Sequence, residues 1–224
     1  MKKVILITGA SRGIGYVLAK KMLKENFFVI GACRDGKIEG IEDDDFYSLS
    51  LDLSKPLSIE NARKTVLAKF KHIDILVNNA GIGPDLDANY PEIKSFEQTF
   101  DVNVTGTVFF TESMIDIIEN NGKIVNISSK MGSLDVCNRT DSVAYRMSKS
   151  ALNMYTKILT NRLENNIRVA SLHPGWVKTT IAKDNIINGR LTTDESADRI
   201  FDFINKDFEN GAFWDIEDQV NLPW

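Results

Sequence analysis

Tyr145 and Lys149 lie four residues apart in a segment whose apolar residues have helical spacing. Residues four apart occupy one face of a helix, so both side chains can reach a common target. A free phenol has a pKa of about 10 and exchanges protons poorly at neutral pH, but a nearby ammonium lowers that pKa toward the working range. The pair therefore predicts a tyrosine general acid or base assisted by Lys149. The alternative is a chance pair on an exposed helix.

Two serines, Ser128 and Ser129, directly follow the apolar strand pattern of residues 124–127. Ligands of open α/β sheets bind at the carboxyl ends of the strands. One of these hydroxyls is therefore placed to donate a hydrogen bond to a substrate carbonyl beside Tyr145. The alternative is an ordinary strand end followed by a serine turn.

A glycine-rich turn, Thr8–Gly15, follows the first apolar strand and leads into a helix that is expected to begin near Ile14. Gly9 permits a sharp turn, Gly13 lets the backbone approach a pyrophosphate, and Gly15 allows close packing of helix and strand. The helix N-terminus would then face the phosphates. The turn predicts a dinucleotide site, although its glycine spacing differs from G-x-G-x-x-G and an ordinary tight turn is the alternative.

The end of the second expected strand holds Cys33, at the place where an NAD enzyme carries an acidic residue for the ribose hydroxyls. Arg34 follows it and Arg12 lies in the glycine turn, so two guanidinium groups can bind the 2′-phosphate of NADP. The sequence therefore favours NADP(H) over NAD(H). Asp35 offers an alternative, because it reaches a ribose if the strand ends later than expected.

These residues depend on elements that bring several strand ends together. Short β-branched runs alternate with longer segments of helical spacing, which is typical of a parallel sheet with crossover helices. The predicted fold is α/β: a Rossmann-type, doubly wound, mostly parallel sheet of about seven strands with helices on both faces. No repeat or linker divides the chain, so residues 1–224 are expected to form a single domain. Strands are expected at residues 4–7, 27–32, 46–51, 73–77, 123–127 and 168–172, and crossover helices at 59–70, 104–118 and 144–159.

Composition narrows the class of protein. The 224 residues are 43% hydrophobic and 26% charged, which excludes an intrinsically disordered chain. The net charge of -4 does not favour nucleic-acid binding, and no apolar run is long enough to cross a membrane. Two cysteines cannot build a disulfide framework, so a cytoplasmic location is expected. His72 and His173 lack partners at metal-ligand spacing, and no metal site is predicted.

In chain order, these motifs resemble the short-chain dehydrogenase/reductase family over essentially the whole chain. Besides the glycine turn and the Y-x-x-x-K pair, the family's N-N-A-G motif matches Asn78–Gly81, its adenine-contacting acidic residue matches Asp52, and its P-G motif matches Pro174–Gly175. The resemblance implies a catalytic tetrad of Asn103, Ser129, Tyr145 and Lys149. It also implies that the cofactor is bound by Gly9, Ser11, Arg12, Gly13, Ile14, Gly15, Arg34, Asp52, Leu53, Asn79, Ala80, Gly81, Tyr145, Lys149, Pro174, Gly175, Val177 and Thr179.

The implied reaction is NADP-dependent hydride transfer between the nicotinamide and a carbonyl or alcohol substrate. Tyr145 would be the general acid/base and Ser129 a second donor to the substrate oxygen. Lys149 would lower the pKa of Tyr145 and bind the nicotinamide ribose, and Asn103 would hold a water that links Lys149 to solvent. One alternative is a cofactor-binding regulatory or signalling protein with little turnover. An isomerase or dehydratase on the same scaffold is another.

Three segments, Tyr145–Met154, His173–Thr179 and Asn221–Trp224, resemble the branch of C-factor-like and sniffer-like carbonyl reductases. The resemblance implies a cytoplasmic, mostly NADP-linked group of enzymes. The chain departs from the pattern of this branch at Thr180–Lys183 and at Glu217–Gln219. Both departures lie where substrate is chosen, so the substrate is not carried over.

The substrate loop, at about residues 179–190, is short. The expected consequence is an open site that accepts small or varied carbonyl or alcohol compounds. The helices after Asn103 and after Ala144 have broader apolar faces than one sheet contact needs. The family pairs these helices across a two-fold axis, so a homodimer or homotetramer is expected.

Overall fold

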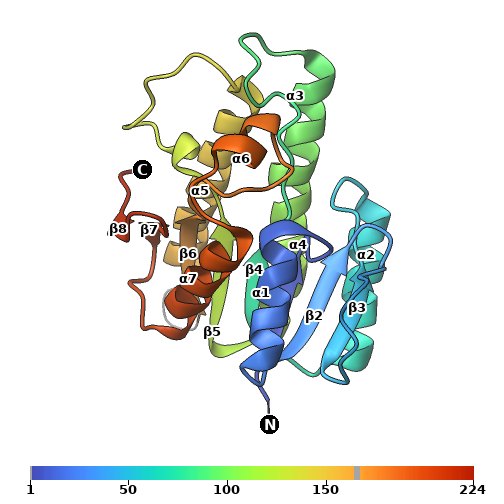
Figure 1. Ribbon diagram of the computed structural model, residues 1–224. Helices are drawn as coiled ribbons and strands as arrows, with labels where there is room; N and C mark the ends of the chain where they lie inside the picture. Colours follow the sequence, from blue (N-terminus) through green and yellow to red (C-terminus); the bar gives the residue numbers. More distant parts are fainter. Residues whose placement is uncertain (1, 164–166) are drawn as a thin grey trace.

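The computed structural model describes residues 2–163 and 167–224, which build one sheet with helices against both faces (Figure 1). The strands are β1 (Val4–Thr8), β2 (Phe28–Cys33), β3 (Phe46–Ser50), β4 (Ile73–Asn78), β5 (Ile118–Ile127), β6 (Ile167–His173), β7 (Ala212–Asp215) and β8 (Val220–Asn221). Their order is β3-β2-β1-β4-β5-β6-β7-β8, and all neighbours are parallel except β7 and β8. The predicted fold class is confirmed: in the described part of the chain the sheet has seven parallel strands and a short antiparallel eighth.

Strand β1 shows why the central strands could be recognised from the sequence. Ile5 and Ile7 pack into the core on one face of the sheet and Leu6 packs into the core on the other, and all three are fully buried. Parallel strands that are covered on both faces read as nearly continuous apolar runs. The two cores hold this strand, and the turn that follows it, in a fixed position.

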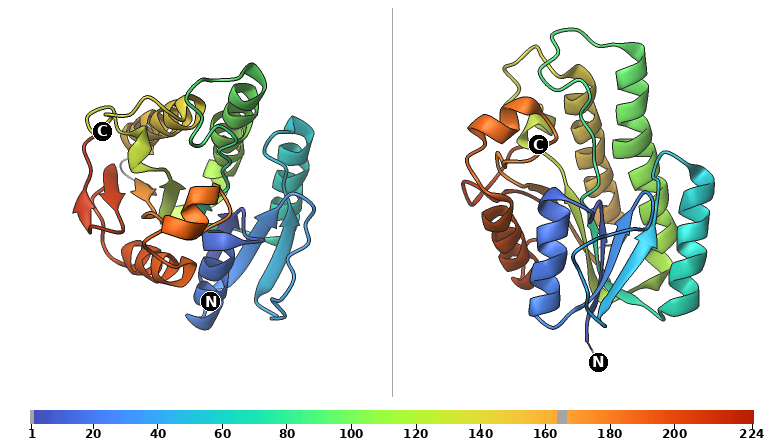
Figure 2. Two further views of the ribbon diagram at one scale, coloured as in Figure 1. Left: turned by 45° about the horizontal axis from the view of Figure 1, so that its top comes forward. Right: turned by 45° about the vertical axis from the view of Figure 1, so that its right-hand side comes forward.

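Helices form a layer on each side of the sheet. The helical elements of the described residues are α1 (Gly13–Lys24), α2 (Pro56–Lys69), α3 (Ile93–Phe100), η1 (Asp101–Gly106), α4 (Thr107–Met114), η2 (Ile115–Ile117), η3 (Lys130–Gly132), α5 (Val143–Leu163), α6 (Lys183–Asn188) and α7 (Thr193–Asn205). α1 and α7 pack together on one face, and α2, α4 and α5 cover the opposite face (Figure 2). This is the three-layer arrangement of a doubly wound fold.

The helical segment before β5 contains one π-helical turn, η1, between α3 and α4. A Cβ at Gly106 in this turn would lie only 2.1 Å from the carbonyl oxygen of Leu53, so the helix approaches that loop closely where it carries glycine. π-Helical turns inside α-helices occur frequently at functional sites, and Asn103 lies in this one. The predicted end of the helix at residue 118 is wrong, because Ile118 pairs with Ile73 as the first residue of β5.

Several elements were not predicted individually from the sequence. β7 and β8 have four and two residues, and α6 has six residues within the expected substrate loop. Segments of this length contain too few residues to show a helical or strand period. The substrate loop at about residues 179–190 therefore contains a short helix rather than irregular chain alone.

Candidate active site

The carboxyl ends of β1, β4, β5 and β6 meet at one edge of the sheet. The strand order reverses between β1 and β4, which is the switch point where dinucleotides bind in sheets of this kind. Gly9 follows β1, Asn79 follows β4, Ser129 lies just beyond β5, and Pro174 follows β6. The fold therefore gathers four motifs that are far apart in the sequence.

The glycine turn is bound tightly to the N-N-A-G segment. A Cβ at Gly9, whose φ is +69°, would lie 2.9 Å from the Cα of Ala80. The Asn79 amide donates hydrogen bonds to the carbonyl oxygens of Thr8 and Gly9, at 2.8 and 3.2 Å. The Thr8 hydroxyl accepts hydrogen bonds from the backbone N–H groups of Asn79 and Ala80. Thr8 was not among the predicted site residues, although it opens the family's glycine motif.

The beginning of α1 has the features of a phosphate site. Arg12 at its N-cap is extended, and within the described part of the chain no side chain caps this helix. Gly13 has a φ of +60°, and a Cβ there would meet only the methyl group of Thr179, at 3.9 Å. Ser11 is exposed and Ile14 half-buried beside this opening. Open space in front of helix N–H groups suits an anion, so these residues fit the pyrophosphate of a dinucleotide.

The end of β2 has no acidic side chain in the position expected for an NAD enzyme. Cys33 is buried, and its thiol donates to Asp35 Oδ1 at 3.3 Å. The same carboxylate oxygen accepts the backbone N–H of Lys37 at 3.1 Å, so Asp35 is engaged within its own turn. Arg34 and Arg12 are both exposed, and neither forms a salt bridge with any residue in the described ranges.

Asp52, the predicted adenine-contacting residue, lies in the turn after β3. Its Oδ1 accepts hydrogen bonds from the backbone N–H and the hydroxyl of Ser54, and its Oδ2 lies 3.2 Å from Lys55 Nζ. Burial raises the pKa of Asp52, but the bonds to Ser54 and Lys55 outweigh burial and the net pKa is lowered. Leu53 beside it is buried under Gly106. The turn after β3 is therefore held in place by contacts between its own residues, Asp52, Ser54 and Lys55.

Tyr145 and Lys149 lie on one face of α5, as their spacing predicted. The ammonium Nζ of Lys149 is 5.5 Å from the centre of the Tyr145 ring and donates a hydrogen bond of 2.8 Å to the carbonyl oxygen of Ile127, the last residue of β5. Ser129 is buried, and its hydroxyl oxygen accepts the backbone N–H of Met131 at 3.1 Å. That bond uses the serine as an acceptor and leaves its proton available for donation.

Burial dominates the electrostatics of this pair. It raises the pKa of Tyr145 to about 12; the charge of Asp85 adds to the rise, and the side chain of Ser129 opposes it. Burial also lowers the pKa of Lys149 to about 8. The expected lowering of the phenol pKa by Lys149 is therefore not seen, because the pKa of Tyr145 is raised. The loss of water around the phenol outweighs an ammonium that is itself buried and bonded elsewhere.

Asn103 is buried and bonded to the segment after β4. Its Oδ1 accepts the backbone N–H of Ile82 at 2.9 Å, and its Nδ2 donates to the Ile82 carbonyl at 2.8 Å. Nδ2 also donates to Ser148 Oγ of α5 at 3.1 Å. A Cβ at Gly81 would lie 3.4 Å from Asn103 Oδ1 and 3.5 Å from Lys149 Nζ, so these two side chains flank Gly81. The expected water between Asn103 and Lys149 stays a prediction.

The P-G segment after β6 is held by a residue that was noted in the sequence only as a departure. Gly175 has a φ of +83°, and a Cβ there would lie 3.2 Å from the Cβ of Glu217. Glu217 Oε2 accepts the backbone N–H of Trp176 at 2.8 Å. Val177 is buried and forms a bridge with Leu191, beyond the substrate loop. The loop that carries Val177 and Thr179 is thus anchored at both ends.

The protein belongs to the short-chain dehydrogenase family, whose model matches residues 3–188. This match covers the glycine turn, the N-N-A-G segment, and both Tyr145 and Lys149. It places the chain among the dehydrogenases and reductases that act on alcohol and carbonyl groups and use a nicotinamide cofactor.

Solved structures of the same fold support the carbonyl reductase branch. The carbonyl reductase Sniffer of D. melanogaster is 27% identical with a TM-score of 0.88, and the comparison covers 100% of both chains. A carbonyl reductase from chicken fatty liver with bound NADPH is 26% identical with a TM-score of 0.85, covering 100% of this chain and 99% of that one. A 3-ketoacyl-(acyl-carrier-protein) reductase from Brucella melitensis, complexed with NADH, is 29% identical with a TM-score of 0.82, covering 95% and 96%.

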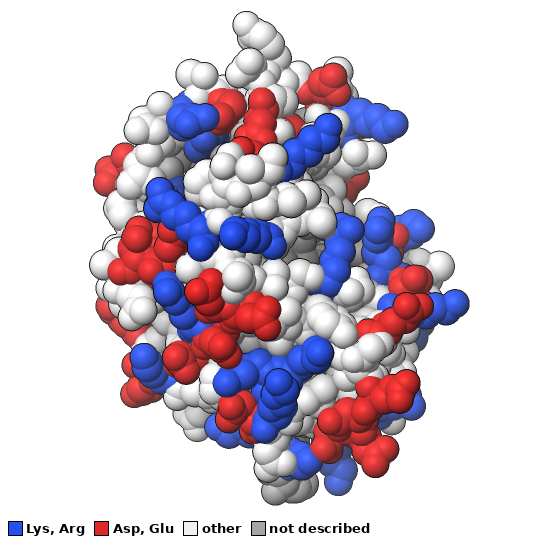
Figure 3. All heavy atoms as spheres, viewed as in Figure 1, with Lys and Arg blue, Asp and Glu red and all other residues white. Residues whose placement is uncertain are grey.

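Within residues 2–163 and 167–224, no helix is both long and apolar enough to cross a membrane, and no three His, Cys, Asp or Glu side chains are grouped as a metal site. Figure 3 shows acidic and basic side chains interspersed over one face, with basic side chains beside the hollow at its centre.

Proposed function

We propose that this chain is an NADP-dependent carbonyl reductase in which Tyr145 is the general acid. The observation that carries the proposal is that Tyr145, Lys149 and Ser129 are buried together at the sheet edge where the glycine turn and the N-N-A-G segment meet. A nicotinamide bound there supplies or accepts the hydride. The protein's own residues then have to orient the substrate oxygen and exchange one proton with it.

Two hydroxyl donors serve the substrate oxygen in this proposal. Negative charge develops on that oxygen as the carbonyl carbon is reduced, and hydrogen-bond donors aimed at it lower the barrier. Ser129 donates a hydrogen bond, and Tyr145 donates a hydrogen bond and then its proton. Lys149 holds positive charge near the phenolate that remains. Asn103 fixes the segment after β4 through its two hydrogen bonds to the backbone of Ile82.

The raised pKa of Tyr145 is compatible with this role. At neutral pH a phenol with a pKa of about 12 stays protonated, which is the form that carbonyl reduction requires. A phenol of this pKa is still a much stronger acid than an aliphatic alcohol, so transfer to the new alkoxide is favourable. The proposed proton donor is therefore in its working state before substrate binds.

The proposal is tested by NADPH oxidation against a panel of aldehydes, ketones and quinones. The Tyr145→Phe variant should lose on the order of a hundredfold or more in kcat, because the general acid is removed, while it still binds NADPH. Tyr90→Phe is the matched control, since Tyr90 is 84% exposed and should keep full activity. A Tyr145→Phe variant with full activity would refute the proposal. Full biological function without turnover would instead favour a regulatory, cofactor-binding protein.

We also propose that Arg34 and Arg12 confer the preference for NADP(H) over NAD(H). Both guanidinium groups are exposed near the glycine turn and the end of β2, whereas Cys33 is apolar and Asp35 is bonded to Lys37. NADPH should bind at least about tenfold more tightly than NADH, which corresponds to about 1.4 kcal/mol. Arg34→Ala should abolish most of that ratio. The control is Lys24→Ala, an exposed cation at the far end of α1. An unchanged ratio in Arg34→Ala would refute the assignment.

The remaining parts of the proposal concern substrate and assembly. The short substrate loop favours small or varied carbonyl or alcohol compounds, and comparable turnover across unrelated members of the panel is expected.

Apolar side chains that are about half exposed or more on α4 and α5 favour a homodimer or homotetramer of single-domain subunits: Phe109, Met147, Met154 and Ile158. A monomer in light scattering at micromolar concentration would contradict this assembly. We expect the protein in the cytoplasm.

A further inference from the structure

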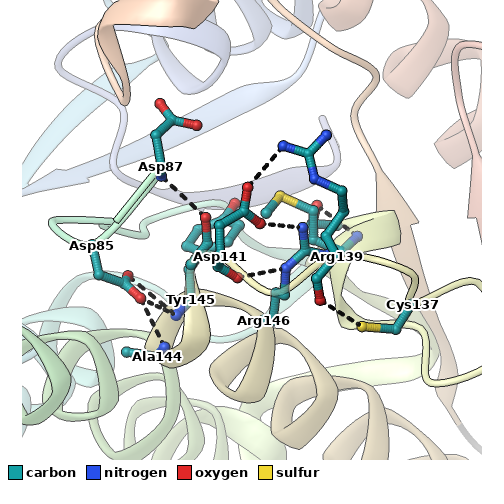
Figure 4. Close-up of polar contacts among 11 residues, drawn as sticks. Asp85, Asp87, Cys137, Arg139, Asp141, Ala144, Tyr145 and Arg146 are labelled. Carbon is teal, nitrogen blue, oxygen red and sulfur yellow. Dashed lines mark hydrogen bonds and ion pairs between the residues drawn. The ribbon is translucent and has the colours of Figure 1, made fainter. Parts of the chain in front are cut away.

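A buried carboxylate lies at the N-terminus of the helix that carries Tyr145. Asp85 is 2% exposed and belongs to the loop between β4 and α3, far from α5 in the sequence. Its Oδ2 accepts the backbone N–H of Ala144 at 2.7 Å, and its two oxygens accept the backbone N–H of Tyr145 at 3.2 and 3.3 Å (Figure 4). Asp85 thus satisfies two backbone donors in the first turn of α5 with charge-assisted hydrogen bonds.

The same loop holds Tyr145 from a second direction. A Cβ at Gly83 would lie 3.0 Å from Cδ2 of the Tyr145 ring, so the backbone of the loop lies against that ring. One residue earlier, Ile82 is held by both amide atoms of Asn103. A rigid connection therefore runs from Asn103 through this short segment to the ring and the backbone of Tyr145.

The loop is attached to the start of α5 at two more points. Ser142 donates its backbone N–H to the carbonyl of Ala88 at 2.9 Å, and its hydroxyl accepts the backbone N–H of Asp87 at 3.1 Å. Figure 4 shows Asp85 and Asp87 on the same stretch of chain, but only Asp85 directs its carboxylate at α5. The two aspartates therefore differ in whether their carboxylate accepts hydrogen bonds from the backbone of α5.

A neutral cap would satisfy the same N–H groups, so the charge needs a reason. Helix N-termini are usually capped by a residue just before the helix, whereas here a buried anion is brought from another loop. Among the described residues, Lys149 of α5 lies over the Tyr145 ring, and the charge of Asp85 on the loop acts on the phenol; Ser129 is neutral. A fixed negative charge close to the tyrosine disfavours the phenolate and favours the protonated phenol.

We propose that Asp85 is a positioning residue for Tyr145, which fixes the first turn of α5 by its hydrogen bonds and disfavours the phenolate by its charge. The inference rests on the proposed role of Tyr145 as general acid. It does not require any contact of Asp85 with substrate or cofactor. Through Asp85, the segment after β4 would determine the position and the pKa of the proposed proton donor.

Three variants separate position from charge. Asp85→Ala removes the hydrogen bonds and the charge, Asp85→Asn keeps an acceptor but removes the charge, and Asp87→Asn is the control in the same loop. Asp85→Ala should lower kcat on the order of tenfold or more, because small misplacements of catalytic groups are costly. Its Kd for NADPH should stay within about twofold of the parent. Asp85→Asn should recover most of kcat, and Asp87→Asn should match the parent.

The charge effect is read without cofactor or substrate. The near-ultraviolet absorbance of phenolate is titrated in the parent, and subtraction of the Tyr145→Phe titration isolates Tyr145 from the other four tyrosines. In Asp85→Asn this titration should move to lower pH, and the pH profile of kcat should move in the same direction. If both curves coincide with those of the parent, the charge role is wrong. If folded Asp85→Ala keeps the parent kcat, the positioning role is wrong.

Failure of the inference about Asp85 can be distinguished from failure of the proposed function. If Tyr145→Phe keeps full activity, the proposed function falls, while the absorbance titration still reports whether Asp85 controls the phenol. If Asp85→Ala does not fold, Asp85→Asn carries both the titration and the pH profile. An Asp85→Asn variant that folds and titrates like the parent overturns the inference.

Discussion

Removal of the Glu217 carboxylate is expected to weaken cofactor binding through the loop that it holds. Glu217 has an 11% exposed side chain and accepts the backbone N–H of Trp176 at 2.8 Å. Its other oxygen lies 3.1 Å from Arg190, whose side chain is 64% exposed. Trp176 follows the P-G motif directly, so this clamp holds the segment that the family resemblance implies binds the cofactor.

The two contacts differ in strength. A hydrogen bond to a charged, largely buried acceptor contributes about 1.5–3 kcal/mol, whereas an ion pair with an exposed partner contributes about 0–1 kcal/mol. If the clamp pre-orders the loop, Glu217→Ala loses up to about 2 kcal/mol of NADPH binding, or roughly 30-fold in Kd. Glu217→Gln keeps an acceptor for Trp176, and Arg190→Ala removes only the exposed partner. Both should weaken binding by less than about fivefold.

The assay is NADPH binding followed by tryptophan fluorescence, with urea unfolding of each variant measured alongside. The expected order of Kd is parent, then Arg190→Ala and Glu217→Gln, then Glu217→Ala. The reasoning is refuted if folded Glu217→Ala binds NADPH as tightly as the parent. It is also refuted if Arg190→Ala weakens binding as much as Glu217→Ala, because the exposed ion pair would then be the important contact.

Three further predictions concern buried polar groups. The pKa of Lys149 is lowered to about 8, so kcat/KM for carbonyl reduction should fall as pH rises through 8 and the ammonium is lost; a flat profile up to pH 10 would contradict this. Burial lowers the pKa of His173 from 6.5 to about 4. Because the unfolded chain then binds the proton first, the free energy of unfolding in urea should fall as pH drops from 6.5 toward 4, and less so in His173→Gln. Asn126 is fully buried and bonded to Asn78 and Thr156, so Asn126→Ala should cost about 2–4 kcal/mol of unfolding free energy. The exposed control Asn61→Ala should stay within about 0.5 kcal/mol.

The parts of the fold that could be predicted are those with a strong local pattern. Residues 4–7 form a continuous apolar run because both faces of β1 are covered, and the glycine turn after it needs glycine for steric reasons that the structure confirms at Gly9. The spacing of Tyr145 and Lys149 is preserved because α5 is a regular helix of 21 residues. Periodicity and spacing are enough to predict the place of a residue when the neighbours that matter lie on the same helix, strand or turn.

The parts that could not be predicted depend on contacts between distant segments. Asp85 lies 59 residues before Ala144, and nothing in the local sequence distinguishes it from the exposed Asp87. Glu217 was visible only as a departure from a family pattern, because its partner Trp176 lies 41 residues away. The π-helical turn around Asn103 has no sequence period of its own. In each case the tertiary packing, not the local pattern, decides the role of the residue.

The same packing accounts for the electrostatic difference at the site. From the sequence alone, the charge of Lys149 was expected to lower the pKa of Tyr145. The spacing of the two residues does not show how much water each side chain loses on folding. Burial acts on both groups and favours the neutral form of each, which raises the pKa of Tyr145 to about 12 and lowers that of Lys149 to about 8. The proton therefore resides on the tyrosine, where carbonyl reduction needs it. In the proposed mechanism, carbonyl reduction starts from this protonated phenol, whereas alcohol oxidation would have to remove a proton that burial and the charge of Asp85 both hold on it.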